Sequence, residues 1–246
     1  MTTDTIAAVA TALSNSGIGI IRVSGNDAVP IVNTLFKNKK RQPLLEKMNS
    51  HTIQYGFIVN DQDEIVDEVM VSLMKAPRSF TTEDTVEINC HGGVLMINKI
   101  MGLLLSHGAR LAEPGEFSKR AFLNGRIDLE EAEGIMNLIE AKTEPARKLS
   151  INQLSGNVSK KIQSLRDDIV KILANIEVNI DYPEYEDIEE MTYEMLTPKI
   201  AEIKEKVLKI LEDSKSGKII TEGIKTSIIG KPNVGKSSIL NTLLGE

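Results

Sequence analysis

A glycine-rich segment near the end of the chain carries residues that could bind a phosphate chain. Positions 230–237 read Gly-Lys-Pro-Asn-Val-Gly-Lys-Ser and satisfy the pattern G-x-x-x-x-G-K-[ST]. Glycines let the backbone wrap closely around phosphate oxygens, which backbone N–H groups and a helix N-terminus then bind. We expect Lys236 to reach the β- and γ-phosphates of a nucleotide and the hydroxyl of Ser237 to bind Mg²⁺. The predicted nucleotide-binding residues are Asn233, Val234, Gly235, Lys236, Ser237 and Ser238.

The segments on either side of this loop give it the context that a phosphate site requires. Ile224–Ile229 is predicted to be a buried strand, and the apolar spacing of Ser238–Leu244 predicts a helix. The alternative is an ordinary glycine turn with an exposed lysine. Only nine residues follow Ser237, whereas a P-loop enzyme also needs a second carboxylate for Mg²⁺, a water-positioning residue and a base-recognition element. We therefore expect an N-terminal piece of a longer protein, which by itself does not hydrolyse a nucleotide.

Composition excludes several other classes of protein. The 246 residues contain 29 Lys and Arg against 35 Asp and Glu, so bulk charge does not favour coating of nucleic acid. Lys37–Arg41 is strongly basic, which leaves a local nucleic-acid contact open beside the alternative of a solvated loop. The single cysteine excludes a disulfide framework and a multi-cysteine metal site. Because no stretch is apolar enough to span a membrane and no signal peptide is recognisable, we expect a soluble, cytoplasmic protein with no membrane partner.

Two regions with different apolar spacing precede the phosphate loop, and the first is predicted to contain both strands and helices. Short β-branched or alternating stretches predict strands at 6–10, 19–24, 51–59, 64–74 and 85–90. Val94–His107 carries a broad apolar stripe and is predicted to be a helix. Asp128 is a good N-cap, and Glu131 completes a capping box for the next helix.

The second region is predicted to be helical. Apolar residues repeat at threes and fours from Ile151 to Ile180, which predicts one long amphipathic helix ended by Pro183. A further helix is predicted over Tyr193–Asp213. The acidic stretch between them, residues 181–190, fits a solvated loop, with a cation site as the alternative. The apolar stripes of both helices require packing partners.

Cys90 and His91 have the residue types of a nucleophile and its base, but their spacing argues against that chemistry. Neighbours on a strand point to opposite faces, so they cannot share a proton. Cys90 is predicted to be a small buried residue, and His91 to begin the turn into the next helix. We assign no catalytic residue in this chain.

Six blocks of sequence carry a resemblance to a known family. They are DTIAA (4–8), GIIRVSG (19–25), APRSFTTED (76–84), CHGG (90–93), PGEFSKRAFLNGR (114–126) and GKPNVGKSSILN (230–241). In this order they resemble the MnmE (TrmE) family of GTPases, which modify the wobble uridine of certain tRNAs. The resemblance implies an α+β tetrahydrofolate-binding-like domain at 1–117, the first half of a helical domain at 118–218 and the start of a P-loop α/β G domain at 219–246.

The resemblance also implies a folate site at Arg22, Glu87 and Arg126. If 85–90 is a strand, Glu87 lies opposite the apolar face, where its carboxylate could accept two hydrogen bonds from the amino-pyrimidine edge of a pterin. The two arginines suit the anionic or carbonyl parts of a folate. Without the family, all three side chains would be interpreted as ordinary surface charges. The family often has Gly where Thr82 stands and a Pro-Pro-Gly-Arg-Gly type turn in place of residues 12–17, so loop details near this site differ.

The family further implies what the whole protein does. It would install a carboxymethylaminomethyl-type group at C5 of the wobble uridine of tRNA, with a flavin-dependent partner of the MnmG (GidA) type. A one-carbon unit would come from 5-formyl- or 5,10-methylene-tetrahydrofolate. GTP, Mg²⁺ at Ser237 and K⁺ at Asn233 would complete the G domain, and the N-terminal domain would form a homodimer.

Two other classes of protein remain as alternatives. A GTP-switched RNA-binding factor of the Era type shares the P-loop block but has no folate-like domain before its G domain. A folate aminomethyltransferase without GTPase function would account for the N-terminal part alone, and the context of Lys236 and Ser237 opposes it.

Overall fold

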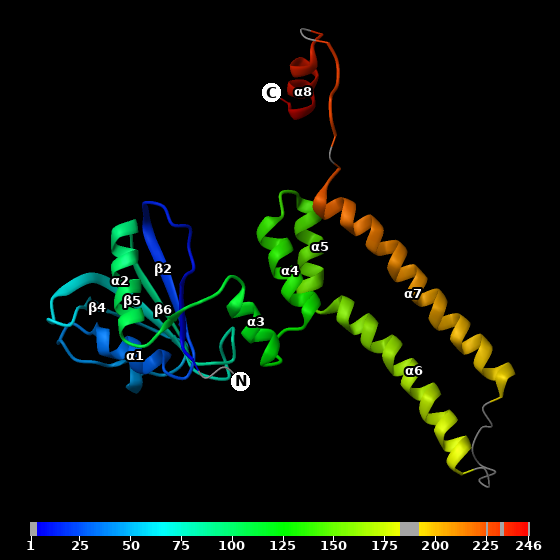
Figure 1. Ribbon diagram of the computed structural model, residues 1–246, viewed down its shortest axis with the longest axis horizontal. Coiled ribbons are helices and arrows are strands. Elements are labelled where there is room, and N and C mark those ends of the chain that lie inside the picture. Colours follow the sequence, from blue (N-terminus) through cyan, green and yellow to red (C-terminus); the bar gives the residue numbers. More distant parts are fainter. Residues whose placement is uncertain (1–3, 183–191, 225, 232–233, 246) are drawn as a thin grey trace. The chain divides into compact units, whose positions relative to one another are not determined.

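The computed structural model describes residues 4–182, 192–224, 226–231 and 234–245. The chain divides into two compact units, Met1–Ala132 and Glu133–Glu246, and each is described by itself (Figure 1). The first unit contains a sheet and three helices, and the second is helical. The predicted fold class, an α+β domain followed by helices, is confirmed.

A seven-stranded sheet forms the first unit, in the order β3-β4-β5-β6-β2-β1-β7. The strands are β1 (Ile6–Val9), β2 (Ser16–Ser24), β3 (Phe36–Lys37), β4 (Thr52–Val59), β5 (Ile65–Met74), β6 (Thr85–Gly92) and β7 (Arg110–Leu111). All neighbours pair antiparallel except β1 and β7, which are parallel. The five strands predicted from sequence are confirmed, each to within three residues at its ends.

Two helices cover one face of this sheet, α1 (Ala28–Leu35) and α2 (Val94–Ser106). The core between sheet and helices contains fully buried side chains from both, among them Ile21 and Val23 of β2, Ile88 of β6 and Ile97 of α2. Alternation along each strand therefore turns the residues between them, such as Arg22, toward the opposite face. The apolar core thus fixes which face of the sheet can hold a polar site.

Helix α1 and the 3-10 helix η1 (Leu45–Lys47) were not predicted, whereas α2 confirms the helix expected at 94–107. Helix α1 has only eight residues and contains Pro30, which weakens its periodic signal. Proline is nevertheless tolerated there, because N–H groups in the first turn need no partner within the helix.

The first unit ends with α3 (Glu116–Leu123) and the start of α4 (Leu129–Glu140), where the predicted capping box is confirmed. The backbone N–H of Glu131 donates to Asp128 Oδ1 at 2.8 Å, and the N–H of Asp128 donates to Glu131 Oε2 at 2.9 Å. Two backbone donors at the helix start are thereby satisfied.

The remaining helices are α5 (Glu144–Leu154), α6 (Asn157–Asp181), α7 (Tyr193–Glu222) and α8 (Lys236–Leu244). The prediction of one helix from Ile151 to Ile180 is wrong, because the chain breaks between α5 and α6. Gly156 adopts φ +67°, and its N–H donates to Gln153 O at 2.9 Å. This left-handed glycine ends α5. The apolar spacing continues across the break, since it records the buried face and not the continuity of the backbone.

Two further predictions in the second unit need correction. The helix expected to end at Asp213 continues to Glu222, where Gly223 at φ +72° ends it. The strand predicted at Ile224–Ile229 is wrong, because the described residues there form no regular secondary structure and Ile229 is 92% exposed. A strand requires a neighbour to pair its N–H and C=O groups, and no strand occurs among the described residues of the second unit.

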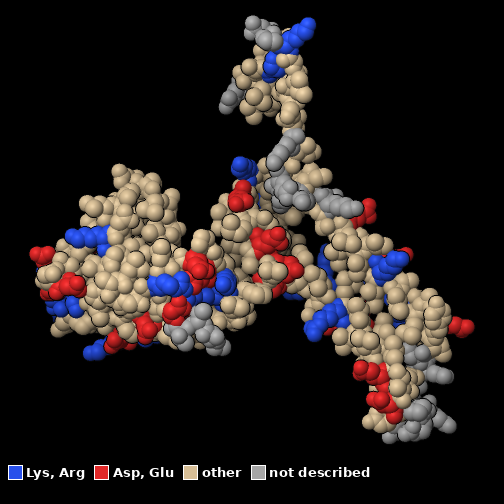
Figure 2. Space-filling view, viewed as in Figure 1, with Lys and Arg blue, Asp and Glu red and all other residues tan. Residues whose placement is uncertain are grey.

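Surface charge is mixed on the face of each unit seen in Figure 2, where basic and acidic side chains lie close to one another. Within the described residues, none of the helices combines the length and the apolar character needed to cross a lipid bilayer.

Candidate functional site

The predicted folate residues Arg22 and Glu87 lie directly opposite each other in the β2–β6 pair. Arg22 Nε donates to Glu87 Oε1 at 2.8 Å, and Nη2 lies 2.7 Å from the same oxygen. Their side chains are 32% and 23% exposed, so the pair borders solvent. The prediction that Glu87 lies opposite the apolar face is confirmed, since Val86 and Ile88 are fully buried in the core.

The third predicted residue, Arg126, lies near Arg22 because both guanidinium groups approach the ring of Phe80. Its guanidinium carbon lies 5.0 Å from the centre of the Phe80 ring, and that of Arg22 lies 6.0 Å from the same ring. Phe117 of α3 adds a second ring, 5.7 Å from Arg22. These four residues and Glu87 form what we call the Arg22 site. It combines one carboxylate, two guanidinium groups and two aromatic faces.

The loop that carries Phe80 is held in place by hydrogen bonds of the buried residue Thr81. Thr81 is fully buried, its hydroxyl lies 2.6 Å from Ser24 Oγ, and its carbonyl accepts from Asn124 Nδ2 at 2.7 Å. Thr82 follows at φ +60°, in the left-handed region that favours glycine. This conformation gives a physical reason for the glycine that the family resemblance implies at this position. Phe80 itself stays half-buried, so its ring remains available at the site.

Arg120 of α3 connects this loop to the start of the chain. Its side chain is only 3% exposed and donates to Glu83 at 3.2 and 3.3 Å, and to the Asp4 carbonyl and carboxylate, both at 2.9 Å. Glu116 Oε1 accepts from it as well, at 3.1 Å. Glu83 also accepts from Ser24 Oγ at 2.8 Å. A buried charge is tolerated when it is paired in this way, and the cluster positions α3 and the Phe80 loop together.

Glu116 is the most perturbed carboxylate of this cluster. Hydrogen bonds from Arg110, at 2.6 and 3.1 Å, are the largest cause of a pKa lowered to about 2 at Glu116, and hydrogen bonds from the Glu113 N–H and Arg120 contribute to the same shift. The same Arg110 also lowers the pKa of Asp4, through a 2.6 Å hydrogen bond. These shifts arise from structural ion pairing and do not identify a catalytic acid.

Cys90 is buried, as predicted, and its surroundings make it a poor nucleophile. Burial raises the pKa of its thiol to about 11, with the charge of Asp67 adding to the effect, and Sγ lies 3.3 Å from the Gly19 carbonyl. His91 belongs to a different pair, with Nδ1 2.6 Å from Asp67 Oδ1. The prediction that Cys90 and His91 do not act together is therefore confirmed.

A shallow hollow of about 290 Å³ lies near His91, and Arg22 and Glu87 do not line it. It is lined by Gly17, Ile18, Tyr55, Glu68, Val69, Met70, Asn89, Cys90 and His91. The hydroxyl of Tyr55 bonds to Glu68 across it. Tyr55 and Glu68 of its lining thus pair with each other, and His91 pairs with Asp67.

The phosphate loop has part of the geometry that was expected of it. Gly235 adopts φ +87° directly before α8, so the N-terminus of this helix follows the loop as predicted. Lys236 Nζ donates to the carbonyls of Gly230 and Lys231, at 3.0 and 2.6 Å. Ser237 and Ser238 lie in the first turn of α8, and Val234 just before it. Asn233, the predicted K⁺ ligand, lies outside the described residues.

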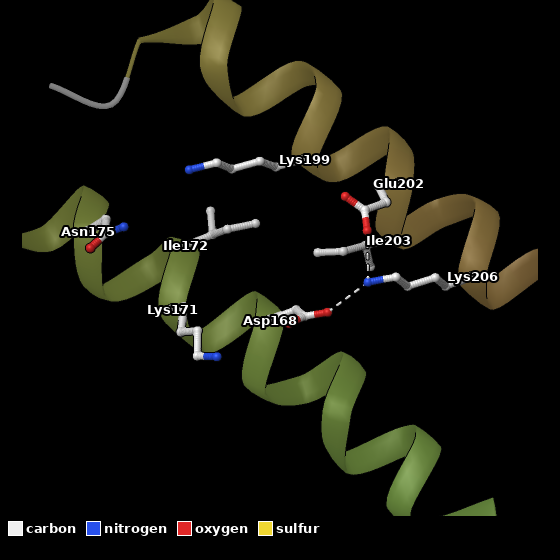
Figure 3. Close-up of a pocket in the computed structure, with 8 residues that line it drawn as sticks. All are labelled: Asp168, Lys171, Ile172, Asn175, Lys199, Glu202, Ile203 and Lys206. Atoms are coloured by element: carbon white, nitrogen blue, oxygen red, sulfur yellow. Dashed lines mark hydrogen bonds and ion pairs between the residues drawn. The ribbon is translucent and has the colours of Figure 1, made fainter. Parts of the chain in front are cut away.

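Another hollow of about 290 Å³ lies between α6 and α7, and charged side chains border it (Figure 3). Lys206 lies at its edge, 3.1 Å from Asp168 and 3.0 Å from Glu202. Ile172 and Ile203 point toward each other across the gap in Figure 3. The hollow is bordered by one ion-pair network, which joins the two helices.

Several residues of the Arg22 site and of the Arg120 cluster beside it were not found from sequence. Phe80, Phe117, Glu83 and Arg120 occur in the blocks that resemble the family, but no spacing rule points to them. They come from a loop and a helix that only the folded chain brings to the strands. One partial signal was present, because Glu116 and Arg120 stand four residues apart, the spacing of an ion pair on one helix face.

Comparison with known proteins agrees with this division of the chain. The family described as "GTP-binding protein TrmE N-terminus" matches residues 5–126, and the "MnmE helical domain" matches residues 129–241. Proteins named "tRNA modification GTPase MnmE" are 58% identical over 244 residues in Bacillus thuringiensis (strain Al Hakam) and Bacillus anthracis, and 57% identical in Bacillus mycoides. The alignment covers 99% of this chain and 52% of each relative, so the chain spans about half their length. With an N-terminal sheet unit and a helical unit that each match their family descriptions, the chain belongs to the TrmE (MnmE) family.

Proposed function

We propose that this chain is the N-terminal part of a tRNA modification GTPase. In the whole protein, acting with a flavin-dependent partner of the MnmG (GidA) type, it would help install a carboxymethylaminomethyl-type group at C5 of the wobble uridine. The names of the relatives and the phosphate loop at residues 230–237 support this proposal. Its site in the first unit would be a tetrahydrofolate site, and its place in the cell the cytoplasm.

The observation that carries the folate proposal is the convergence of Arg22, Glu87 and Arg126 around Phe80. The carboxylate of Glu87 can accept hydrogen bonds from the amino-pyrimidine edge of a pterin. The two guanidinium groups can bind the carboxylates of the folate tail, and the half-buried Phe80 ring offers a stacking face. These residues fit 5-formyl- or 5,10-methylene-tetrahydrofolate, which supplies a one-carbon unit when bound.

The nucleotide proposal rests on the loop before α8. Lys236 and the N-terminus of α8 would bind the phosphates of GTP, and the hydroxyl of Ser237 would bind Mg²⁺. Lys236 now bonds to two loop carbonyls, so phosphates would have to draw its ammonium group away from them. K⁺ binding at Asn233 stays a prediction, as does homodimer formation through the first unit. That the 246-residue chain does not itself hydrolyse GTP also stays a prediction, which a phosphate-release assay checks.

Calorimetry with 5-formyltetrahydrofolate tests the folate proposal on the whole 246-residue chain. We expect the wild type to bind, and Glu87→Ala to weaken binding by about tenfold or more, because a charge-assisted hydrogen bond is lost. Glu144→Ala, which removes an exposed carboxylate of the second unit, is the matched control and should bind as the wild type does. Absence of binding to the wild type, or equal binding to Glu87→Ala, would contradict the proposal.

Tryptophan fluorescence offers a second test, because the sequence contains no tryptophan. Phe80→Trp introduces one indole at the Arg22 site, and folate that stacks on it should quench its emission. Phe57→Trp places the indole on β4, beside Tyr55, and should show no saturable quenching.

A further inference from the structure

The guanidinium of Arg22 binds the carboxylate of Glu87 with two adjacent N–H donors, as the donor edge of a ligand would. Its Nε and Nη2 atoms both approach Oε1 of Glu87, at 2.8 and 2.7 Å. A 2-amino-4-oxopyrimidine presents a similar edge, with a ring N–H beside an exocyclic amino group. Both groups are guanidine-like donor forks for one carboxylate. Arg22 and such an edge therefore compete for the same acceptor.

We propose that Arg22 is a specificity-determining residue, which occupies Glu87 until a ligand with both a donor edge and an anionic tail replaces it. The inference rests on the proposed folate site and adds a selection rule to it. A ligand with the edge alone must break the ion pair and leave the charge of Arg22 without a counter-charge. A ligand with an anionic tail breaks the same pair and supplies a new partner for the freed guanidinium.

The surroundings of Arg22 allow this exchange. Its side chain is 32% exposed, so the guanidinium can turn toward solvent without disturbing the core. Phe80 and Phe117 lie 6.0 and 5.7 Å from it and offer aromatic faces along which the cation can move. The Phe80 ring is itself held in place, because its neighbour Thr81 bonds to Ser24 and Asn124. The movement would then be confined to one side chain.

Arg126 differs from Arg22 in that its guanidinium does not occupy the carboxylate of Glu87. Its guanidinium lies against the Phe80 ring, 5.0 Å from the ring centre, and belongs to an exposed residue. Arg22, and not Arg126, is the partner of Glu87, so Arg126 can bind an anionic tail without breaking that ion pair. Arg126 therefore serves as the matched control, since its substitution removes the same charge from the same site.

The experiment measures the affinity of two probes for three forms of the 246-residue chain by calorimetry. The probes are 5-formyltetrahydrofolate, which has a glutamate tail, and 6-methyltetrahydropterin, which has the ring edge without the tail. In Arg22→Met we expect the tail-less probe to bind about two- to fivefold more tightly, because an internal competitor is removed. The folate should bind about tenfold more weakly to the same variant, since the tail loses a charged partner.

The control variant separates competition from simple charge loss. Arg126→Met should weaken folate binding and should not tighten binding of the tail-less probe, because Arg126 is not the group that occupies Glu87. Arg22→Lys, which keeps the charge but not the fork, should recover part of the folate affinity. Equal or weaker binding of the tail-less probe to Arg22→Met would overturn the exchange, even if folate binds the wild type. No folate binding to the wild type would instead overturn the proposed function.

Discussion

Arg120 donates to both carboxylate oxygens of Glu83, at 3.2 and 3.3 Å, although the two residues stand 37 positions apart in the chain. We expect Arg120→Ala to lower the free energy of unfolding of the first unit by about 3–5 kcal/mol, because it leaves the largely buried carboxylate of Glu83 without its cation. Urea denaturation followed by circular dichroism measures the change.

The matched control is Arg41→Ala, which removes the exposed pair with Asp63. Exposed pairs contribute about 0–1 kcal/mol, so this variant should unfold close to the wild type. An Arg120→Ala variant as stable as Arg41→Ala would show that the cluster around Glu83 does not hold the loop.

Acid should weaken the first unit through Glu116. The pKa of this carboxyl is lowered to about 2 by Arg110, against an ordinary value of 4.5. A lowered pKa stabilises the fold above pH 4.5, and the contribution is lost as the pH falls from 4.5 toward 2. The loss should be about 1–3 kcal/mol. Urea unfolding at a series of pH values checks it, and Glu116→Gln should flatten that part of the profile.

Gly156 should resist substitution because of its backbone conformation. At φ +67° an L-residue costs about 1–2 kcal/mol, so Gly156→Ala should lower the unfolding temperature of the helical unit. Gly102→Ala is the opposite case, since that glycine lies within α2 and an added Cβ meets no atom within 4 Å. It should stabilise the first unit by about 0.5–1 kcal/mol. The same sign for both variants would contradict this account.

His91 should titrate above its ordinary pKa of 6.5. Asp67, whose carboxylate lies 2.6 Å from Nδ1, raises the pKa of His91 through a hydrogen bond and its charge. The pair therefore stabilises the fold below pH 6.5, and its contribution is lost as the pH rises through the raised pKa. Proton NMR of the imidazole measures the titration. In Asp67→Asn the pKa should fall toward 6.5, and an unchanged value would assign the shift to another group.

The core and the capping box could be predicted from sequence because local rules govern them. Alternation places Ile21 and Val23 on one face of β2 and Arg22 on the other, and the register with β6 then brings Glu87 opposite. Asp128 and Glu131 satisfy each other within one helical turn. Such features require no knowledge of distant segments.

What could not be predicted depends on distant segments or on a single backbone angle. The contacts of Arg120 with Asp4 and Glu83 join segments that no spacing rule connects, and only Glu116 stands at helical i,i+4 spacing to it. The break at Gly156 requires a left-handed angle at one residue, while the apolar spacing around it stays helical. The expected strand at Ile224–Ile229 failed for a related reason, since β structure depends on a neighbour that local sequence does not supply.

The antiparallel pairing of β2 with β6 makes the Arg22 site a reporter of folding. Arg22 and Glu87 face each other only in the native register, and a slip of one residue would turn either side chain toward the helices. A ligand that needs both groups therefore binds correctly paired chains and not slipped ones. By mass action such a ligand, at about 100 times its dissociation constant, would favour the native pairing by about 2.7 kcal/mol. Ligand supply would then influence how much of the newly made protein survives.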